Sequence, residues 1–262
     1  MIDTPDVVVR YETRGVAAWL TIDRPESRNA LTPGVVEGLH TGILRASNDA
    51  ALRAVVLTAA GDKAFCAGAD LKLAATTAPP DPAQNTSTFA KMLRSFMECP
   101  LPLVARVNGH CMAGGMGLLA MCDLAVAVDY ANFGLPEVKI GLFPMQVLSI
   151  LRAILGARQL AELSLTGEPI GSREALVAGL INYAVPASEL DAKVEWLLAR
   201  LVDKSPTAQR RGKFAMRAID GMRWDIALPY LETQLRTLTE TQDAREGRRA
   251  FVERRPPEWT GR

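Results

Sequence analysis

The sequence predicts an α/β fold with a largely parallel sheet, followed by a region made of helices. Up to about residue 145, short apolar runs such as 53–60, 103–107 and 124–128 alternate with helical patterns. This alternation is typical of layered α/β cores, because parallel strands need a crossover connection, usually a helix. Beyond residue 145 the pattern is mostly helical. With 262 residues and 48% hydrophobic content, the chain is long enough for a substantial core, either as one domain or with an appendage.

Turn and capping residues define the first elements. Two strands are expected at residues 7–11 and 16–22, joined by a hairpin turn over residues 12–15. Thr32 and Pro33 suit the N-cap and first position of a helix. The apolar residues on one face of that helix are Val35, Val36, Leu39 and Ile43.

The later elements follow the same pattern. Residues 74–87 have no period and are expected to form a mobile loop, followed by a helix from about Thr88 to Glu98. Helices are predicted at 145–155, 157–165 and 172–179, and a short strand at 181–185. The last helices begin near Ser188 and Ser205, and a final one carries Leu228, Leu231, Leu235 and Leu238 on one face. Such apolar faces should pack on the core or on another subunit.

Two loops of small residues indicate a place where backbone can approach a ligand. Gly114, Gly115 and Gly117 fall in the first turn of a helix, where each costs about 1 kcal/mol relative to Ala. N–H groups at a helix start can donate to a ligand oxygen, as in an oxyanion hole. A second loop has the same order: residues 53–60 are expected to form a buried strand, and small residues followed by polar ones continue through 61–72. The alternative is that the glycines only allow tight packing on a neighbouring element.

Composition excludes several classes of function. The net charge is +1 and no unbroken Lys/Arg block occurs, which argues against nucleic acid as a partner. The basic stretch 245–255 is interrupted by Glu246, Phe251 and Glu253, so a solvated helix face is favoured over a phosphate contact. There is no leader-like start and no run of 18 apolar residues. A soluble, cytoplasmic protein without a membrane partner is therefore expected.

The cysteines do not indicate a metal site. Cys66, Cys99, Cys111 and Cys122 lack metal-ligand spacing with the two histidines of the chain. Reduced and mostly buried thiols are expected in a cytosolic protein.

Four motifs, in order, resemble those of the crotonase (enoyl-CoA hydratase/isomerase) superfamily. They are RPESRNAL at 24–31, AFCAGADLK at 64–72, the glycine-rich stretch 108–123 and GLPE at 134–137. The resemblance covers essentially the whole chain. It implies a crotonase-like spiral of ββα turns over residues 1–195 and a helical region over 196–262 that forms homotrimers, often paired into homohexamers. It also implies an acyl-CoA thioester as substrate, with coenzyme A carried by the substrate and no separate cofactor.

The resemblance also assigns roles to residues at the matching positions. The N–H groups of Ala69 and Gly114 would form the oxyanion hole, where loss of one donor typically costs about 10²–10³ in rate. The coenzyme A adenine would lie against backbone near Cys66 and Ala67. Lys72 is either a phosphate contact or an ordinary surface lysine.

Glu137 would be the catalytic carboxylate, although without the family the more ordinary role for a carboxylate at a helix start is to cap that helix. Family hydratases use two glutamates that hold a water between them, and the first of these positions is occupied here by Gly117. Gly117 is therefore expected to face the reacting carbons, and Met145 the acyl group.

Three functions remain open at this stage. Hydration of a 2-enoyl-CoA by a single glutamate is the first. Isomerisation of a 3-enoyl-CoA to a 2-enoyl-CoA is a close alternative, because one glutamate can remove and return the proton in turn. A non-catalytic acyl-CoA-binding protein is the third. Asp70, Asp123 and His110, although close to the motifs, are expected to make local structural hydrogen bonds.

Overall fold

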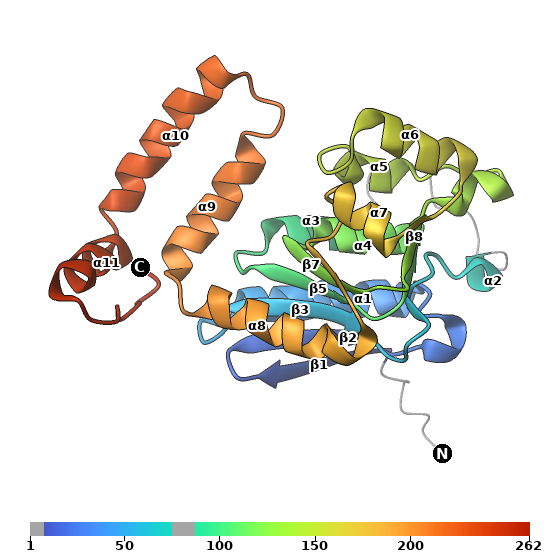
Figure 1. Ribbon diagram of the computed structural model, residues 1–262, viewed down its shortest axis with the longest axis horizontal. Coiled ribbons are helices and arrows are strands. Elements are labelled where there is room, and N and C mark those ends of the chain that lie inside the picture. Colours follow the sequence, from blue (N-terminus) through green and yellow to red (C-terminus); the bar gives the residue numbers. More distant parts are fainter. Residues whose placement is uncertain (1–7, 75–86) are drawn as a thin grey trace.

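Figure 1 shows the computed structural model of the protein, which describes residues 8–74 and 87–262. The main sheet has the strand order β1-β2-β3-β5-β7-β10. Strand β1 is antiparallel to β2, and all other neighbours are parallel. The strands are β1 (Val9–Arg14), β2 (Ala17–Ile22), β3 (Ala54–Ala59), β5 (Leu103–Val107), β7 (Leu124–Val128) and β10 (Tyr183–Val185). The α/β prediction is confirmed.

The first hairpin differs from the prediction. Strand β1 continues through Arg14, which pairs with Ala17, so the turn is only Gly15 and Val16 and not residues 12–15. Gly15 has a φ of +57°, a left-handed conformation that glycine adopts without strain. The polar side chains of Glu12, Thr13 and Arg14 suggested a turn, but they lie on the outermost strand of the sheet, where solvent can solvate them.

A second, smaller sheet was not predicted from the sequence. Its order is β4-β6-β8-β9, with β4, β6 and β8 parallel and β9 antiparallel. Its strands are β4 (Ala64–Cys66), β6 (His110–Met112), β8 (Asn132–Gly134) and β9 (Ile170–Gly171). Strands of two or three residues are too short to show an alternating pattern.

Helices cover both faces of the main sheet. Every residue of β2 and β3 is buried, as in parallel sheets with helices on both sides. Helix α1 (Pro33–Ser47) packs on β1 and β2, and α8 (Leu190–Val202) packs on β3, β5 and β7. Helix α1 begins as predicted, with the Thr32 hydroxyl accepting a hydrogen bond from Val35 N at 3.3 Å.

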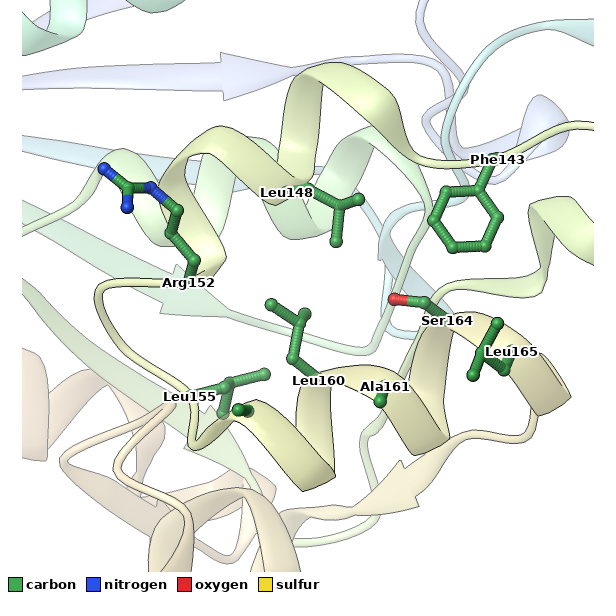
Figure 2. Close-up of a pocket in the computed structure, with 9 residues that line it drawn as sticks. Phe143, Leu148, Arg152, Leu155, Leu160, Ala161, Ser164 and Leu165 are labelled. Atoms are coloured by element: carbon green, nitrogen blue, oxygen red, sulfur yellow. The ribbon is translucent and has the colours of Figure 1, made fainter.

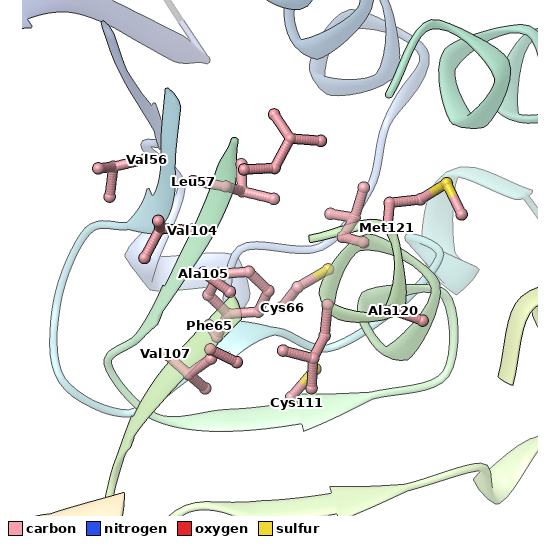
Figure 3. Close-up of a cluster of buried hydrophobic side chains, with 14 of the residues drawn as sticks. Val56, Leu57, Phe65, Cys66, Val104, Ala105, Val107, Cys111, Ala120 and Met121 are labelled. Atoms are coloured by element: carbon pink, nitrogen blue, oxygen red, sulfur yellow. The ribbon is translucent and has the colours of Figure 1, made fainter. Parts of the chain in front are cut away.

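The core continues from the main sheet to the small one. Figure 3 shows side chains of β3 and β5 meeting Phe65 and Cys66 of β4, Cys111 of β6 and Met121 of α4 (Gly114–Met121). All four cysteines are free, and Cys66, Cys99 and Cys111 are buried. The small sheet is thereby fixed against the large one, and the loops that leave its strands start from a rigid base.

The remaining helices lie over the small sheet or beyond the core. Helices α3 (Thr88–Glu98), α5 (Met145–Leu151), α6 (Ala157–Thr166) and α7 (Ser172–Val177) lie near α4 and the small sheet. Helices α9 (Pro206–Ala218) and α10 (Trp224–Thr239) project from the core as an antiparallel pair, followed by α11 (Gln242–Glu253). Short helices are η1 (Pro25–Ser27), α2 (Leu71–Ala74), η2 (Pro136–Ile140) and η3 (Ala187–Glu189). The predicted mobile loop at 74–87 falls almost wholly outside the described residues.

The helical region divides differently from the predicted boundary at 195/196. The boundary predicted between residues 195 and 196 lies inside α8, and this helix packs on three strands of the main sheet. We therefore place the start of the helical extension after Val202. On α10, Leu228 and Leu235 are exposed, so the predicted apolar face of this helix is open within one chain.

Candidate active site

Three adjacent parallel strands end at the candidate site. Gly68 and Ala69 follow β4, Ala113 and Gly114 follow β6, and Glu137 follows β8. Because β4, β6 and β8 are parallel neighbours, their carboxyl ends lie at one edge of the small sheet. Ala69, Gly114 and Glu137 line one pocket there, with a volume of about 640 Å³. The short strands absent from the prediction are therefore what brings the three predicted residues together.

Two backbone N–H groups at this edge are free to bind a ligand. Leu31 N donates to Gly68 O at 2.8 Å, and Asp70 N donates to Leu31 O at 3.0 Å, so the Ala69 N–H between them is left over. Gly114 is the first residue of α4, where N–H groups have no partner within the helix. Across residues 8–74 and 87–262, neither N–H has a hydrogen-bond partner. Both have the availability that an oxyanion hole requires.

The two donor loops are in direct contact. A Cβ at Gly68 would lie 2.5 Å from Ala113 Cβ and 3.2 Å from Gly114 N, so only glycine fits there. Gly68 also has a φ of +89°. Ala113 has a φ of 51° and a ψ of −122°, a conformation that costs about 1–3 kcal/mol for a residue with a side chain. This strained turn sets the position of the Gly114 N–H.

Glu137 is half-buried beside these donors. It lies in the first turn of η2, and its Oε2 is buried without a hydrogen-bond partner among the described residues. Burial raises the pKa of its carboxyl above the ordinary value, and its own backbone N–H opposes this with a smaller effect. Among the described residues that line the pocket, Glu137 is the only carboxylate. A carboxylate with an unpaired oxygen can accept a proton from a bound ligand.

Apolar side chains lie against Gly117, the residue at the first of the two glutamate positions. Gly114 and Gly117 face the same way, as predicted, because a Cβ at either would meet Phe89 Cζ, at 3.8 and 3.5 Å. A Cβ at Gly117 would also lie 3.2 Å from Val147 Cγ2. Gly117 is buried behind these two side chains, which themselves line the pocket, so its place beside the reacting carbons stays a prediction.

The other glycine of this turn has a packing role. A Cβ at Gly115 would lie 2.6 Å from Cys66 O, so this glycine allows α4 to approach β4. The packing alternative considered for the glycines therefore holds for Gly115. Met145, by contrast, does line the pocket and is 71% exposed at its rim.

The residues predicted to hold coenzyme A are spread around this pocket. Cys66 is fully buried, backbone included, and burial raises the pKa of its thiol to about 12. Ala67 lines the pocket and also a neighbouring one of about 720 Å³ that contains Arg28 and Lys63. Lys72 is exposed on α2 and lines neither pocket. Sequence reasoning missed Arg28 and Lys63, although both lie inside or beside the recognised motifs.

Three polar side chains near the motifs have local partners, as predicted. Asp70 accepts from Leu73 N at 3.3 Å and pairs with Arg24 at 3.2 Å. His110 Nδ1 accepts from Asn132 N at 3.1 Å. The partners of Asp123 are Leu103 N, Lys213 and Arg217. These groups hold loops and helices in place.

No group of three or more His, Cys, Asp or Glu side chains in residues 8–74 and 87–262 is arranged to hold a metal ion. No helix in the same part of the chain is long and apolar enough to cross a membrane.

Comparison with known proteins identifies relatives along almost the whole chain. The model of the family described as "Enoyl-CoA hydratase/isomerase" matches residues 12–262. A Thermus thermophilus protein provisionally named as an enoyl-CoA hydratase is 35% identical over 247 residues, covering 93% of this chain and 97% of its own. The crystal structure of an enoyl-CoA hydratase from Mycobacterium smegmatis has a TM-score of 0.89 at 32% identity, covering 96% of this chain and 98% of its own. One from Mycobacterium tuberculosis has a TM-score of 0.88 at 30% identity, covering 98% and 100%.

Proposed function

The chain belongs to the enoyl-CoA hydratase/isomerase family, and on that premise we propose that it converts a 3-enoyl-CoA into a 2-enoyl-CoA with Glu137 as the only acid–base group. One observation carries this choice among the reactions of the family. Among the described residues the pocket offers one carboxylate with an unpaired oxygen, while Gly117 carries no side chain and lies against Val147 and Phe89. A shift of the double bond needs one group that removes and returns a proton, whereas hydration is favoured by two groups that hold a water.

The proposed reaction uses the three strand-end residues together. Ionised Glu137 removes a proton from C2 of the substrate, and the electron pair moves into the carbonyl to give an enolate. The N–H groups of Ala69 and Gly114 donate to that oxygen, which carries the developing negative charge. Protonated Glu137 then delivers the proton to C4, and the double bond forms between C2 and C3. The raised pKa of Glu137 makes its carboxylate a stronger base for removing the C2 proton, and a group whose pKa lies closer to the operating pH can act in turn as base and as acid.

Coenzyme A would extend from the pocket along the loop that follows β4. We propose that the adenine lies against the backbone near Cys66 and Ala67, since Ala67 lines both neighbouring pockets. The cationic side chains available for the phosphates are Lys72, as first predicted, and Arg28 and Lys63 beside Ala67.

Hydration of a 2-enoyl-CoA is the second candidate. Several similar proteins are named enoyl-CoA hydratases, among them those from the two Mycobacterium species. A single glutamate could activate a water and then deliver its proton to the substrate, at the cost of holding the water less firmly. The non-catalytic alternative has less support, because the free donors and the unpaired carboxylate oxygen lie in one pocket.

A substrate panel tests the proposal. Purified protein is given 3-enoyl-CoA and 2-enoyl-CoA thioesters of equal chain length, and isomerisation and hydration are recorded separately. We expect isomerisation to be the faster reaction. Faster hydration would select the second candidate, and tight binding without either reaction would select the non-catalytic one.

We also propose that copies of the chain associate as a homotrimer or homohexamer. The projecting α9–α10 pair exposes large apolar side chains, including Met216, Trp224, Ile226 and Leu235. Light scattering after gel filtration gives the number of subunits, and a monomer would contradict this.

A further inference from the structure

A second apolar pocket lies between α5 and α6, on the other side of one wall of the active-site pocket. Its volume is about 380 Å³. Phe143 lines both pockets, so its ring forms part of the boundary between them. Figure 2 shows the residues of this α5–α6 pocket, which are Phe143, Leu148, Arg152, Leu155, Ala157, Leu160, Ala161, Ser164 and Leu165.

Ser164 is the unusual residue in this apolar lining. It is 2% exposed, and its Oγ is buried without a hydrogen-bond partner among the described residues. Figure 2 shows this hydroxyl directed from α6 into the space between the two helices, next to Phe143. Burying a hydroxyl without a partner is unfavourable, so each such group in a folded protein needs an explanation.

No backbone carbonyl of α6 accepts a hydrogen bond from the Ser164 hydroxyl, although another hydroxyl on the same helix makes such a bond. Thr166, two residues further on α6, donates to Glu162 O at 2.6 Å, the usual bond of a hydroxyl to the carbonyl four residues earlier. Ser164 makes no such bond in the described part of the chain. Its hydroxyl therefore remains available to a molecule in the pocket, as the Glu137 Oε2 does in the neighbouring one.

We infer that the α5–α6 pocket receives the distal part of a long acyl group, and that the Ser164 hydroxyl binds an oxygen substituent on that acyl chain. This inference rests on the proposed function for the position of the thioester. Helix α6 packs against η2, which carries Glu137, so the two pockets adjoin at the reactive end. Phe143 lines both pockets and is only half-buried, so its side chain has room to rotate, and the inference requires this rotation to connect the pockets. The substrate class is therefore a long-chain 3-enoyl-CoA with a hydroxyl or carbonyl group in its distal half.

Filling the pocket tests where the chain lies. Ala161→Trp places an indole in the α5–α6 pocket, and Glu162→Trp, on the same helix but outside the lining, is the matched control. Each buried methylene contributes roughly a fourfold change in affinity, so excluding two or more lowers kcat/KM by at least about 10-fold. We expect this loss for 3-dodecenoyl-CoA with Ala161→Trp, an unchanged value for 3-butenoyl-CoA, and neither loss with Glu162→Trp. An equal change for both substrates, or no change, overturns the inference.

Removing the hydroxyl tests what Ser164 binds. Ser164→Ala should lower kcat/KM about 3- to 10-fold for a 3-dodecenoyl-CoA that carries a distal hydroxyl group, the usual effect of one lost hydrogen bond. For the unsubstituted 3-dodecenoyl-CoA the same variant should be equal to or better than the native protein, because no hydroxyl is left unpaired. Identical effects on the two substrates overturn the assignment of Ser164.

Binding measurements separate this inference from the proposed function. If neither isomerisation nor hydration occurs, butyryl-CoA and dodecanoyl-CoA are compared by calorimetry. Weaker binding of dodecanoyl-CoA alone to Ala161→Trp supports the α5–α6 pocket even though the proposed reaction fails. If Ala161→Trp changes the number of subunits but leaves the preference for acyl-chain length unaltered, the inference is overturned. Such a result would show that a second copy of the chain covers the α5–α6 pocket.

Discussion

Two glutamates of this protein, in two regions, have opposite surroundings. Glu246 of α11 has a side chain that is 9% exposed, and it pairs with Arg255 at 2.6 Å and Arg249 at 2.5 Å and accepts from Glu258 N at 3.0 Å. The hydrogen bond from Arg255 is the largest of the effects that lower its pKa to about 2. Glu137 lies among apolar residues with one oxygen unpaired, and burial raises its pKa. A paired carboxylate fixes structure, whereas an unpaired one keeps its proton-accepting capacity for a ligand.

The largest expected effect comes from Glu137→Gln. Glutamine preserves the shape of the side chain but cannot take up the proton, so turnover should fall by about 10²–10⁴. The melting temperature should stay the same or rise slightly, because burying a charged carboxylate with one oxygen unpaired is unfavourable. Steady-state kinetics and calorimetry measure the two quantities.

Glu246→Gln is the matched change in the other region. It should lower the melting temperature, because Arg249 and Arg255 lose their carboxylate partner, and it should leave turnover per folded molecule unchanged. If Glu137→Gln destabilised the protein and kept its rate, Glu137 would be a structural cap and the contrast between the two glutamates would disappear.

The second prediction extends the contrast to backbone donors. The N–H of Thr260 is bonded to Asp243 at 2.8 Å, whereas that of Gly114 is free. Gly114→Pro removes the free N–H at the first position of α4, and turnover of the folded variant should fall by about 10²–10³. Gly114→Ala keeps the N–H and places its Cβ 3.0 Å from Leu31 Cδ1, the end of a flexible side chain, so its loss should be much smaller. Equal losses in the two folded variants would argue against a role for this N–H.

The third prediction concerns pH. Because Glu137 must be ionised to accept a proton, kcat/KM should fall on the acid side at a pH above the ordinary glutamate value of about 4.3. Its raised pKa contributes stability that is present below the unfolded-state value and is lost as the pH rises through the folded-state value. Relative to Glu137→Gln, the native protein should therefore lose stability as the pH rises from about 4 towards neutrality.

Glu246 should show the opposite dependence on pH. Its lowered pKa contributes stability above about pH 4.3, and this is lost as the pH falls towards about 2. Urea unfolding of the native protein and both variants across this range measures the two slopes. Slopes of the same sign would contradict the assigned surroundings of one glutamate.

The sequence was sufficient for much of the fold because its longer elements carry strong patterns. Buried strands such as β5 and β7, and the capped start of α1, follow from apolar runs and from Thr32 and Pro33. Strands β4, β6 and β8 could not be predicted, because each has only three residues, whose partners come from distant parts of the chain. The motifs nevertheless named Ala69, Gly114 and Glu137, since each lies just after one of those strands.

The side chains that surround the site were harder to predict from the sequence than the position of the site in the fold. Gly117 has no side chain, so nothing in the sequence showed that Val147 and Phe89 would occupy the space in front of it. These two residues come from α3 and from α5, about 30 residues on either side of Gly117, and only the packing of the helices brings them there. The isolation of Glu137 is likewise a property of packing, because it depends on which side chains line the pocket.

The smallest expected effect comes from giving Glu137 a charged neighbour. Gly117→Glu alone should lower both isomerisation and hydration, because a Cβ at this position would lie 3.2 Å from Val147 Cγ2 and the added side chain must displace Val147. The double variant Gly117→Glu with Val147→Ala removes that methyl contact and leaves space beside Glu137. A second carboxylate there would hold a water and raise one of the two pKa values further, supplying the protonated acid that hydration requires.

We expect the ratio of hydration to isomerisation to rise several-fold relative to Val147→Ala alone, which controls for the lost packing. Both rates are measured with 2-enoyl-CoA and 3-enoyl-CoA of equal chain length. An unchanged ratio in a double variant that still binds substrate would mean that position 117 does not reach the reacting carbons, and that the isolation of Glu137 is not what selects isomerisation.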